Sequence, residues 1–327
     1  MTAIKIENLK RHFGPIRAID GLSCEIAQGS VCGFIGANGA GKTTTMRILA
    51  TLDEPDSGRV EICGYDVMQN PNEVRRKVGW MPDQFGHYEH TTVLEYLDFY
   101  SRALGYKGKD RRQRIDEVMQ FTDLVPLKDR FMNALSKGMN QRLGLGRALL
   151  GDPQVLIMDE PAAGLDPKAR VEFKHLVRVL AQEGKTIFIS SHILSELGEM
   201  CDVLLFIDQG KLVHHGNTDS LRRHTDQDAG VTYQVQLDGT DDALSQWCIL
   251  QPDVRFMEAR KSGGRILIQN DEPAKIAELL SRMIHSGLKV TEFQREERNL
   301  EDAFIDMIGM LDQKNASIPK AGSNKNS

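Results

Sequence analysis

Apolar and polar side chains alternate through residues 4–10 and again through residues 18–27, with Gly14 and Pro15 between the two segments. Alternation with a period of two is the pattern of a strand with one buried and one exposed face. The Gly-Pro pair between the segments favours a turn. We therefore expect the chain to begin with a pair of antiparallel strands.

Three other segments are mainly apolar without alternation, which is the pattern of a strand buried on both faces of a sheet. They are residues 31–35, 155–158 and 186–190. From residue 83 to about residue 130 the apolar side chains instead recur at helical spacing. Asp166 and Pro167 form a cap and first turn for a further helix, which Gly184 ends.

The pattern changes after a polar, charged stretch over residues 218–230, which is expected to be a linker. The predicted elements beyond it are a strand, a helix, two strands, a helix and a strand, over residues 231–237, 241–250, 254–259, 265–269, 273–285 and 288–293. This β-α-β-β-α-β order predicts a small ferredoxin-like domain. A last helix is expected from Asn299, followed by a tail over 312–327 that is expected to be disordered.

Composition places the chain among ordinary soluble globular proteins. It has 327 residues, of which 40% are hydrophobic and 27% charged, so two domains are expected. The formal net charge of −5 argues against nucleic acid as a partner, because phosphate contacts demand a basic surplus. The amino terminus lacks the pattern of a secretory signal, and no apolar run is long enough to span a membrane. Any role at a membrane is therefore expected to depend on a partner.

The five cysteines are scattered and form no Cys-x-x-Cys pair, so we expect reduced, mostly buried thiols. His87 and His90 flank Glu89, but no third convincing ligand lies nearby in sequence. They are expected to be exposed histidines and not metal ligands.

A phosphate-binding loop follows the first buried strand. Its residues fit the pattern Gly-x4-Gly-Lys-Thr and are Gly36, Ala37, Asn38, Gly39, Ala40, Gly41, Lys42, Thr43 and Thr44. The glycines let backbone N–H groups wrap a polyphosphate at the start of a helix, Lys42 would reach the β- and γ-phosphates, and the Thr43 hydroxyl would bind Mg²⁺. The loop alone does not distinguish whether the protein is an ATPase, a GTPase, a kinase or a helicase.

Two later motifs add polar groups to this loop. Ser136 and Gly138 stand ahead of a predicted helix at 143–150 and form a second possible phosphate-binding cap. Asp159 and Glu160 end the apolar strand at 155–158, where Asp159 could hold Mg²⁺ through water and Glu160 could polarise an attacking water. Phe13 precedes the first turn, where it either stacks on a purine or caps the hairpin as a core residue.

Taken together, these motifs resemble an ABC-type ATPase over roughly residues 4–217. The sequence of residues 135–166, together with Ser190-Ser191-His192, is similar to that of the ATP-binding subunits that pair with small permeases for drug, antibiotic or polysaccharide export. The resemblance implies an α/β P-loop fold with a mixed core sheet, an antiparallel β subdomain and a helical subdomain at about 84–150. The expected organisation is then an ATP-binding domain over 1–217, a linker over 218–230, an accessory α+β domain over 231–311 and the tail.

The resemblance also implies a role for each motif. Phe13 matches the aromatic residue that stacks on adenine, and Asp159 and Glu160 match the magnesium-shell acid and the catalytic base. His192 matches the histidine that contacts the γ-phosphate, and Asp166 the loop that faces the opposite subunit. Ser136 and Gly138 match the signature that closes on ATP bound by the partner.

Two positions depart from the family pattern. The glutamine that senses Mg²⁺ and reports to the permease is replaced by Asp83, with Gln84 one residue later, and either could reach the metal. Lys137 and Met139 occupy signature positions where Gly and Gln are commonest.

The leading hypothesis is therefore an ATPase that binds ATP and Mg²⁺, dimerises with a second ATPase subunit, and powers an integral-membrane permease from the cytoplasmic face. A soluble ABC ATPase acting on ribosomes or DNA is an alternative, although Lys42 and Leu135 are 93 positions apart with no sustained heptads between them. A nucleotide-dependent interaction module without hydrolysis is another, against which Glu160 and His192 argue.

Overall fold

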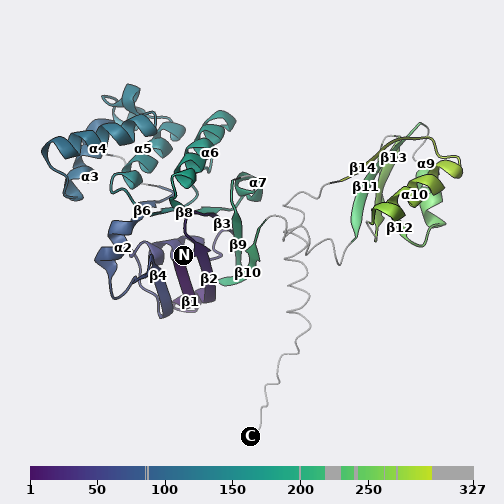
Figure 1. The fold of residues 1–327 in the computed structure, drawn as a ribbon, viewed down its shortest axis with the longest axis horizontal. Coiled ribbons are helices and arrows are strands. Elements are labelled where there is room, and N and C mark those ends of the chain that lie inside the picture. The colour runs from purple at the N-terminus through teal and green to yellow at the C-terminus, as the bar shows by residue number, and fades with distance from the viewer. Residues whose placement is uncertain are drawn as a thin grey trace, which may run out of the picture. The chain divides into compact units, whose positions relative to one another are not determined.

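The computed structural model describes residues 1–84, 86, 88–198, 200–217, 230–238, 242–260, 262–269 and 272–296. The chain divides into two compact units, Met1–Thr218 and Asp219–Ser327, each with a hydrophobic core (Figure 1). Of the predicted linker over 218–230, only Gly230 is described. The predicted last helix and tail, together with His87, lie outside the described residues.

An antiparallel sheet of order β2-β1-β4-β5 opens the first unit. Its strands are β1 (Thr2–Phe13), β2 (Ile16–Ala27), β4 (Ser57–Ile62) and β5 (Tyr65–Asp66). The predicted hairpin is confirmed, and Phe13 pairs with Ile16 at its tip. Ile4 and Ile6 are buried while Lys5 between them is half-buried, as the alternation of apolar and polar residues requires.

A second, mixed sheet of order β10-β9-β3-β8-β7-β6 forms the centre of the unit. Its strands are β3 (Val31–Ile35), β6 (Val78–Met81), β7 (Val155–Met158), β8 (Thr186–Ser191), β9 (Val203–Asp208) and β10 (Lys211–Gly216). All neighbouring pairs are parallel except β9 and β10. The carboxyl ends of β3, β6, β7 and β8 therefore meet at one edge, where the polar motifs follow.

Helices complete the first unit and, with the sheets, match the mixed α/β architecture expected from the sequence. They are α1 (Lys42–Leu49), α2 (Pro71–Lys77), α3 (Val93–Ala103), α4 (Gly108–Phe121), α5 (Lys137–Leu149), α6 (Pro167–Gln182) and α7 (Leu194–Leu197), with short 3-10 turns at Val125–Leu127 and Met132–Ala134. Helices α3, α4 and α5 gather into a group of their own beside the core sheet (Figure 1). Thr92 and Glu95 form a reciprocal cap that starts α3.

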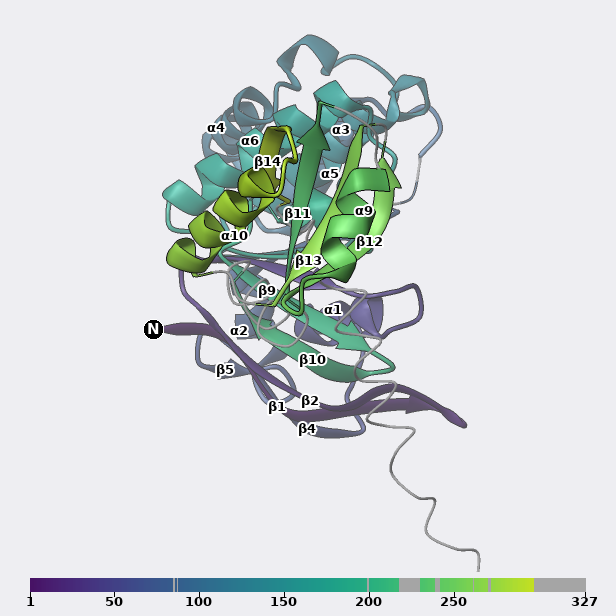
Figure 2. The same ribbon diagram turned by 90° about the vertical axis from the view of Figure 1, so that its right-hand side faces the viewer.

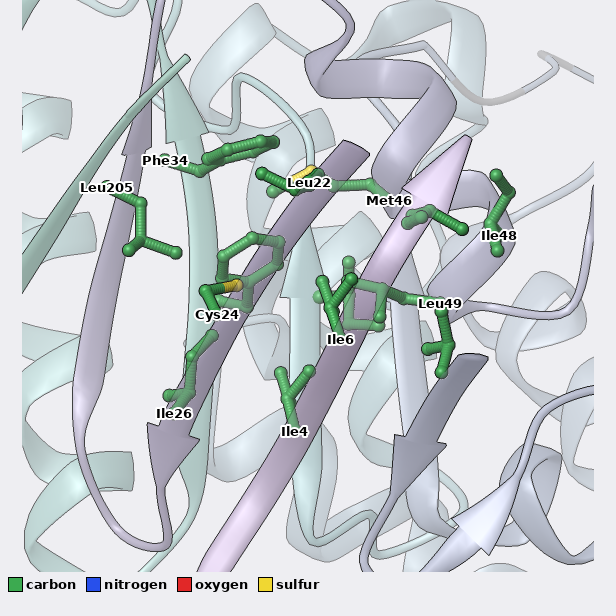
Figure 3. Packing of buried hydrophobic residues seen from close by; sticks show 14 of the residues in the cluster. Ile4, Ile6, Leu22, Cys24, Ile26, Phe34, Met46, Ile48, Leu49 and Leu205 are labelled. Carbon is green, nitrogen blue, oxygen red and sulfur yellow. The ribbon is translucent and has the colours of Figure 1, made fainter. Parts of the chain in front are cut away.

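The main core of the unit lies between the two sheets and contains α1. Ile4 and Ile6 of β1, Leu22 of β2, Phe34 of β3 and Met46 of α1 are among the buried side chains that meet there (Figure 3). Burying one such side chain contributes roughly 1.5–3 kcal/mol to folding. This packing anchors both ends of the loop between β3 and α1.

The second unit is the predicted β-α-β-β-α-β domain. Its elements are β11 (Val231–Leu237), α9 (Asp242–Ile249), β12 (Val254–Arg260), β13 (Gly263–Ile268), α10 (Pro273–His285) and β14 (Val290–Arg295). The sheet has the order β12-β13-β11-β14, with every neighbouring pair antiparallel. Both helices cover one face of this sheet (Figure 2), and Leu244, Trp247 and Met283 pack against its strands.

Candidate active site

The loop between β3 and α1 is closely surrounded by backbone. Gly41 has a φ angle of +108°, and a Cβ atom there would lie 2.3 Å from the carbonyl oxygen of Ala18. A Cβ atom at Gly36 would lie 2.4 Å from the carbonyl oxygen of Ile207. A side chain at Gly41 would therefore push β2 away, and one at Gly36 would push β9 away. This explains why glycine occupies both positions.

Helix α1 begins at Lys42, whereas the residues after the loop predict a helix only from Thr45 onward. Gly41 is its cap residue, and its carbonyl oxygen accepts hydrogen bonds from the backbone N–H of Thr45 at 3.0 Å and from the Thr45 hydroxyl at 2.9 Å. The first N–H groups of a helix have no partner within it and carry a partial positive charge. The loop thus ends on a group of donors suited to an anion.

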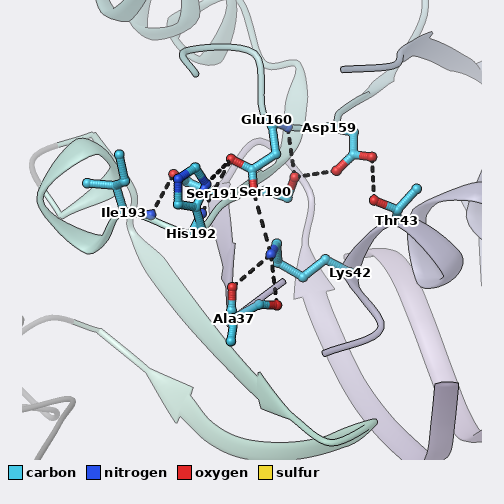
Figure 4. Close-up of polar contacts among 10 residues, drawn as sticks. Ala37, Lys42, Thr43, Asp159, Glu160, Ser190, Ser191, His192 and Ile193 are labelled. Atoms are coloured by element: carbon cyan, nitrogen blue, oxygen red, sulfur yellow. Dashed lines mark hydrogen bonds and ion pairs between the residues drawn. The ribbon is translucent and has the colours of Figure 1, made fainter. Parts of the chain in front are cut away.

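Lys42 is buried, with 6% of its side chain exposed, and its ammonium group has three oxygen neighbours (Figure 4). Nζ donates to the carbonyl oxygens of Gly36 at 2.7 Å and Ala37 at 3.3 Å. It also lies 3.4 Å from Oε1 of Glu160. The positive charge of Lys42 therefore contacts both the phosphate loop and Glu160, which follows β7.

Asp159 follows β7 and accepts hydrogen bonds at both carboxylate oxygens. The Thr43 hydroxyl donates to Oδ2 at 2.7 Å, and the Ser190 hydroxyl donates to Oδ1 at 2.6 Å. Asp159 is 3% exposed. Its carboxylate is consequently held in one orientation beside the Thr43 hydroxyl (Figure 4).

Glu160 turns away from the strand with a positive φ angle of 48°, an unfavourable conformation for a residue with a side chain. Its N–H donates to the Ser190 hydroxyl at 2.9 Å, which helps to hold that conformation. Its Oε2 lies 2.8 Å from Nδ1 of His192 and accepts the His192 backbone N–H at 3.4 Å. The Glu160 carboxylate thus lies between Lys42 and His192 (Figure 4).

These residues surround a cavity of about 380 Å³. It is lined by Ala18, Asn38, Gly39, Gly41, Lys42, Thr43, Thr44, Asp83, Asp159, Glu160, Ala163 and His192. The structure therefore brings together the phosphate loop, the two acidic residues after β7 and the histidine after β8, although Lys42 and His192 are 150 positions apart in the sequence. The remaining loop residues Gly36, Ala37 and Ala40 are not part of this lining.

The structure distinguishes the two candidates for the metal-sensing position. Both residues are exposed, but Asp83 lines the cavity and Gln84 does not. Burial raises the pKa of the Asp83 carboxyl above its ordinary value, and the neighbouring Asp159 carboxylate adds to the increase.

Ser136 and Gly138 line a different cavity, of about 350 Å³, together with Asp166 and Arg142. Ser136 caps α5, and its hydroxyl accepts the N–H of Met139 at 3.3 Å. The prediction that Gly138 stands ahead of the helix is wrong, because α5 begins at Lys137 and Gly138 belongs to its first turn. A Cβ atom at Gly138 would lie 3.1 Å from Cβ of Ala169, so glycine allows α5 to approach α6 closely.

Phe13 ends β1 and is not part of the lining of the 380 Å³ cavity; 45% of its surface is exposed. The Arg11 guanidinium lies over its ring at 4.6 Å from the centroid. Asp53 and Asp56 hold that guanidinium at 2.8 and 2.9 Å. One face of the ring is thus occupied by a cation, and the residue is not a core side chain.

Ser190 is the residue whose role sequence reasoning missed. The sequence places it at the end of a buried strand, and the parallel pairing of β7 with β8 brings it beside Asp159. A serine in an otherwise apolar strand was the available signal. A hydroxyl buried at 0% exposure needs hydrogen-bond partners, and the two acidic residues provide them.

Comparison with known proteins identifies the family of this site. The sequence model of the ABC transporter family matches residues 19–163. The bacitracin transport ATP-binding protein of Bacillus licheniformis is 34% identical over 312 residues, which cover 94% of this chain and 98% of the relative. The chain belongs to the ATP-binding proteins of the ABC transporter family. The Nod factor export ATP-binding protein of Ralstonia nicotianae is 33% identical over 94% of both chains.

Solved ABC cassettes share the fold of this ABC ATPase. An ATP-binding cassette of an ABC transporter in its ADP conformation superposes with a TM-score of 0.62 at 27% identity, over 66% of this chain and 91% of that one. A dimeric cassette in a post-hydrolysis state, bound to ADP and phosphate, gives a TM-score of 0.60 at 25% identity, over 65% of this chain and 98% of that one.

Membership of this family makes the chain an ATP-binding protein and an ATPase. In the part of the chain that the structure describes, no helix is long and apolar enough to cross a membrane.

Proposed function

We propose that this ABC ATPase works as one half of a dimer that encloses two ATP molecules and drives a separate membrane permease in the direction of export. The observation that carries the proposal is the set of contacts at Glu160. Its carboxylate lies 3.4 Å from the phosphate-loop Lys42 and 2.8 Å from His192. A carboxylate so placed stands where the γ-phosphate and an attacking water would meet.

ATP binds in this proposal with its phosphates in the loop and its adenine on Phe13. The Lys42 ammonium exchanges its contacts with Gly36 and Ala37 for oxygens of the β- and γ-phosphates. Because the guanidinium of Arg11 covers one face of the Phe13 ring, the base stacks on the other.

The residues present fit a magnesium ion. Thr43 Oγ1 and Asp159 Oδ2 are 2.7 Å apart, and hydroxyl and carboxylate oxygens are the ligands that Mg²⁺ prefers. Among the described residues no three His, Cys, Asp or Glu side chains gather as a metal site. Mg²⁺ commonly takes one or two protein ligands, with phosphates and waters completing its shell. When bound, it would offset charge on the β- and γ-phosphates, and Asp83 rather than Gln84 lies at its edge of the cavity.

Hydrolysis follows from the placement of Glu160. Its carboxylate accepts a proton from water, the water oxygen attacks the γ-phosphorus, and the bond to the bridging oxygen of ADP breaks. Lys42 and His192 stabilise the charge that develops on the transferred group. The products are ADP and inorganic phosphate.

A second subunit is proposed because the signature residues lie outside the cavity of the phosphate loop. Ser136 and Gly138 line the cavity that also contains Asp166, and the phosphate loop lines another. Two copies that face each other head to tail would place the signature of each on the ATP of the other. The dimeric cassette bound to ADP and phosphate supports this arrangement.

The permease is proposed to bind beside α3. A cavity of about 610 Å³ lies there, lined by Trp80 of β6, Tyr100 and Leu104 at the end of α3, and Arg147 of α5 among others. Phe99 of α3 is 62% exposed. An amphipathic segment of a membrane protein fits such an apolar and basic surface. Transport rather than ribosome or DNA binding is favoured because the relatives are named for transport and export, and cross-linking from Phe99 in membranes would identify the partner.

The substitution Glu160→Gln tests the proposed chemistry. The amide cannot accept a proton, so kcat is expected to fall by about 100-fold or more. Because the amide keeps the size of the side chain, ATP should still bind and should now hold the subunits together. Phosphate release and size-exclusion chromatography with ATP measure the two effects.

The exposed Glu183 at the end of α6 provides the control. Glu183→Gln should leave phosphate release unchanged and should produce no stable dimer. Wild-type turnover by Glu160→Gln would remove Glu160 from the chemistry, and a strictly monomeric Glu160→Gln variant at saturating ATP would contradict the shared site.

A further inference from the structure

Arg11 packs against the Phe13 ring and is itself held by two carboxylates. Its guanidinium carbon lies 4.6 Å from the centroid of the ring. One guanidinium nitrogen donates to Oδ1 of Asp53 at 2.8 Å, and the other donates to Oδ1 of Asp56 at 2.9 Å. Only 23% of the Arg11 side chain is exposed. The cation is therefore fixed against one face of the ring.

The two carboxylates belong to the segment between α1 and β4. Asp53 follows α1, and the first residue of that helix is Lys42 of the phosphate loop. Asp56 precedes β4, and its second carboxylate oxygen accepts the backbone N–H of His12 at 2.6 Å. The segment after α1 is thus joined to the end of β1 through side-chain and backbone hydrogen bonds. These bonds connect the aromatic ring with the far end of the helix that begins at the phosphate loop.

The Phe13 ring stands at the tip of the first hairpin, close to the phosphate loop along β2. Phe13 pairs with Ile16, and Ala18 lies two residues further along the same strand. Ala18 lines the cavity of about 380 Å³ that contains the phosphate loop. Two residues of a strand span roughly 7 Å. A nucleotide whose phosphates lie in the loop therefore has its base on the side of the cavity where the ring stands.

A cation on one face of an aromatic ring changes what the opposite face binds. The π-system of phenylalanine is negative on its faces and positive at its edge, and a guanidinium is attracted to such a face. Arg11 draws this electron density toward itself, so the opposite face becomes a better partner for an electron-rich purine. Phe13 keeps 45% of its surface exposed although Arg11 covers one face. The opposite face is therefore accessible to a base.

We propose that Arg11 is a positioning residue for the nucleotide base. Held by Asp53 and Asp56, it fixes the Phe13 ring at a set place relative to the phosphate loop and favours a purine over a pyrimidine on the open face of the ring. The inference rests on the proposed function, in which the adenine of ATP stacks on Phe13. It deepens that function, because it assigns the preference for a purine to a side chain that touches neither nucleotide nor attacking water.

The substitution Arg11→Met tests the role, because it keeps much of the length of the side chain and removes the charge. Weaker stacking of the base is expected to raise the KM for ATP by about tenfold, while kcat stays within about twofold at saturating ATP. The ratio of kcat/KM for ATP to that for CTP should fall by about fivefold, because the smaller pyrimidine gains less from the ring. An ATP to CTP ratio equal to that of wild type would overturn the role in base preference.

A nucleotide without its base separates positioning from damage to the phosphate loop. Ribose 5-triphosphate carries the phosphates alone, and calorimetry should give the same affinity for it in wild type and in Arg11→Met. The double variant Asp53→Asn, Asp56→Asn should weaken ATP binding by about threefold or more and should also leave this base-free probe unaffected. Weaker binding of the probe to Arg11→Met would overturn the assignment, and so would unchanged ATP binding in the double variant.

A double-mutant cycle with Phe13→Leu shows whether Arg11 acts through the ring. Phe13→Leu by itself should raise the KM for ATP, because the base loses its aromatic partner. In that background, Arg11→Met should change the KM by no more than about twofold, since two groups that act through one contact are not additive. A KM that rises by the product of the two single effects would show that Arg11 acts independently of Phe13 and would reject the proposal.

Arg59 supplies the matched control within the same antiparallel sheet. Its guanidinium is likewise held by two carboxylates, Glu61 at 2.8 Å and Asp66 at 3.1 Å. Arg59→Met therefore removes an equivalent pair of contacts from the sheet without touching the Phe13 ring. It should bind ATP, CTP and the base-free probe as wild type does.

Failure of this inference is distinguishable from failure of the proposed function. A wild-type protein that neither binds nor hydrolyses ATP would contradict the proposed function, and Phe13→Leu with the KM of wild type would contradict the stacking of adenine. If wild-type turnover is normal and Phe13→Leu raises the KM, an Arg11→Met variant that behaves like Arg59→Met rejects only the role of Arg11.

Discussion

Ser190 shows how a single small side chain sets the geometry of two acidic residues. Its hydroxyl donates to Asp159 at 2.6 Å and accepts the N–H of Glu160 at 2.9 Å. Glu160 has a positive φ angle, which costs on the order of 1–3 kcal/mol unless its surroundings hold it. Ser190 therefore supports both the carboxylate proposed to lie beside Mg²⁺ and the one proposed to act as base.

We predict that Ser190→Ala lowers kcat by about tenfold or more. The substitution leaves the Glu160 N–H without its acceptor and frees one oxygen of Asp159, a loss of roughly 1–3 kcal/mol. Steady-state phosphate release measures the effect. Ser23→Ala is the control, because the Ser23 hydroxyl likewise accepts a backbone N–H, from Asn8 at 2.8 Å, but lies away from the site. Equal losses in the two variants would show that Ser190 has only a structural role.

At the scale of elements, Arg142 ties α5 to its neighbours. One guanidinium nitrogen lies 3.0 Å from Asp123, after α4, and another pairs with Glu172 of α6. Ser136 and Asp166 cap the starts of α5 and α6, and both line the cavity of about 350 Å³. The ion pairs of Arg142 therefore hold these two helix starts at a constant separation.

We predict that Arg142→Ala weakens the ATP-dependent dimer by about tenfold or more, with little change in the affinity of one subunit for ATP. The substitution removes the cation that Asp123 and Glu172 share and lets α5 move against α6. Dimer dissociation is measured by analytical ultracentrifugation in the Glu160→Gln background. Arg102→Ala, which removes an exposed ion pair within α3, should leave the dimer intact. An equal weakening of nucleotide binding to the monomer would instead indicate damage to the phosphate loop.

For the whole molecule, the two units carry separate hydrophobic cores that contain different cysteines. Cys24 and Cys32 lie in the core of the first unit and Cys248 in that of the second. All five thiols are free. Burial raises the pKa of Cys24 to about 12 and that of Cys248 to about 11, and it also raises the pKa of Cys32 and Cys201. A raised pKa means less thiolate at neutral pH, so these thiols are unreactive while their unit is folded.

We predict that thiol labelling along a urea series reports the unfolding of each unit separately. In the native protein at pH 8, Cys63 should react first, because it is only half-buried. Cys248 should become reactive when the second unit unfolds, and Cys24 and Cys32 when the first unit unfolds. Each of these unfolding events should be one cooperative step. Mass spectrometry of the labelled peptides identifies the sites. Simultaneous labelling of Cys24 and Cys248 at every urea concentration would show that the units unfold as one.

Local patterns in the sequence were sufficient for most elements. The unbroken apolar run of β3 and the helix expected over 273–285 predict elements whose ends coincide with Val31–Ile35 and Pro273–His285. Helices α1 and α5 begin earlier than predicted, at Lys42 and Lys137, because glycine and polar residues in their first turns hide helical spacing. The conformation of these first helical turns depends on the loops that precede them, and the periodicity of side chains does not reveal that dependence.

The sequence by itself determined the family and the types of residues that meet at the site, since the spacing of the phosphate loop, Asp159-Glu160 and His192 is carried by local motifs. Only the tertiary structure decided which side chains face the cavity and which face away. The parallel pairing of β7 with β8 brings Ser190 to both acidic residues, and the turn after β6 places Asp83, and not Gln84, in the lining of the cavity. Such choices depend on contacts between segments distant in the chain, so no local pattern can express them.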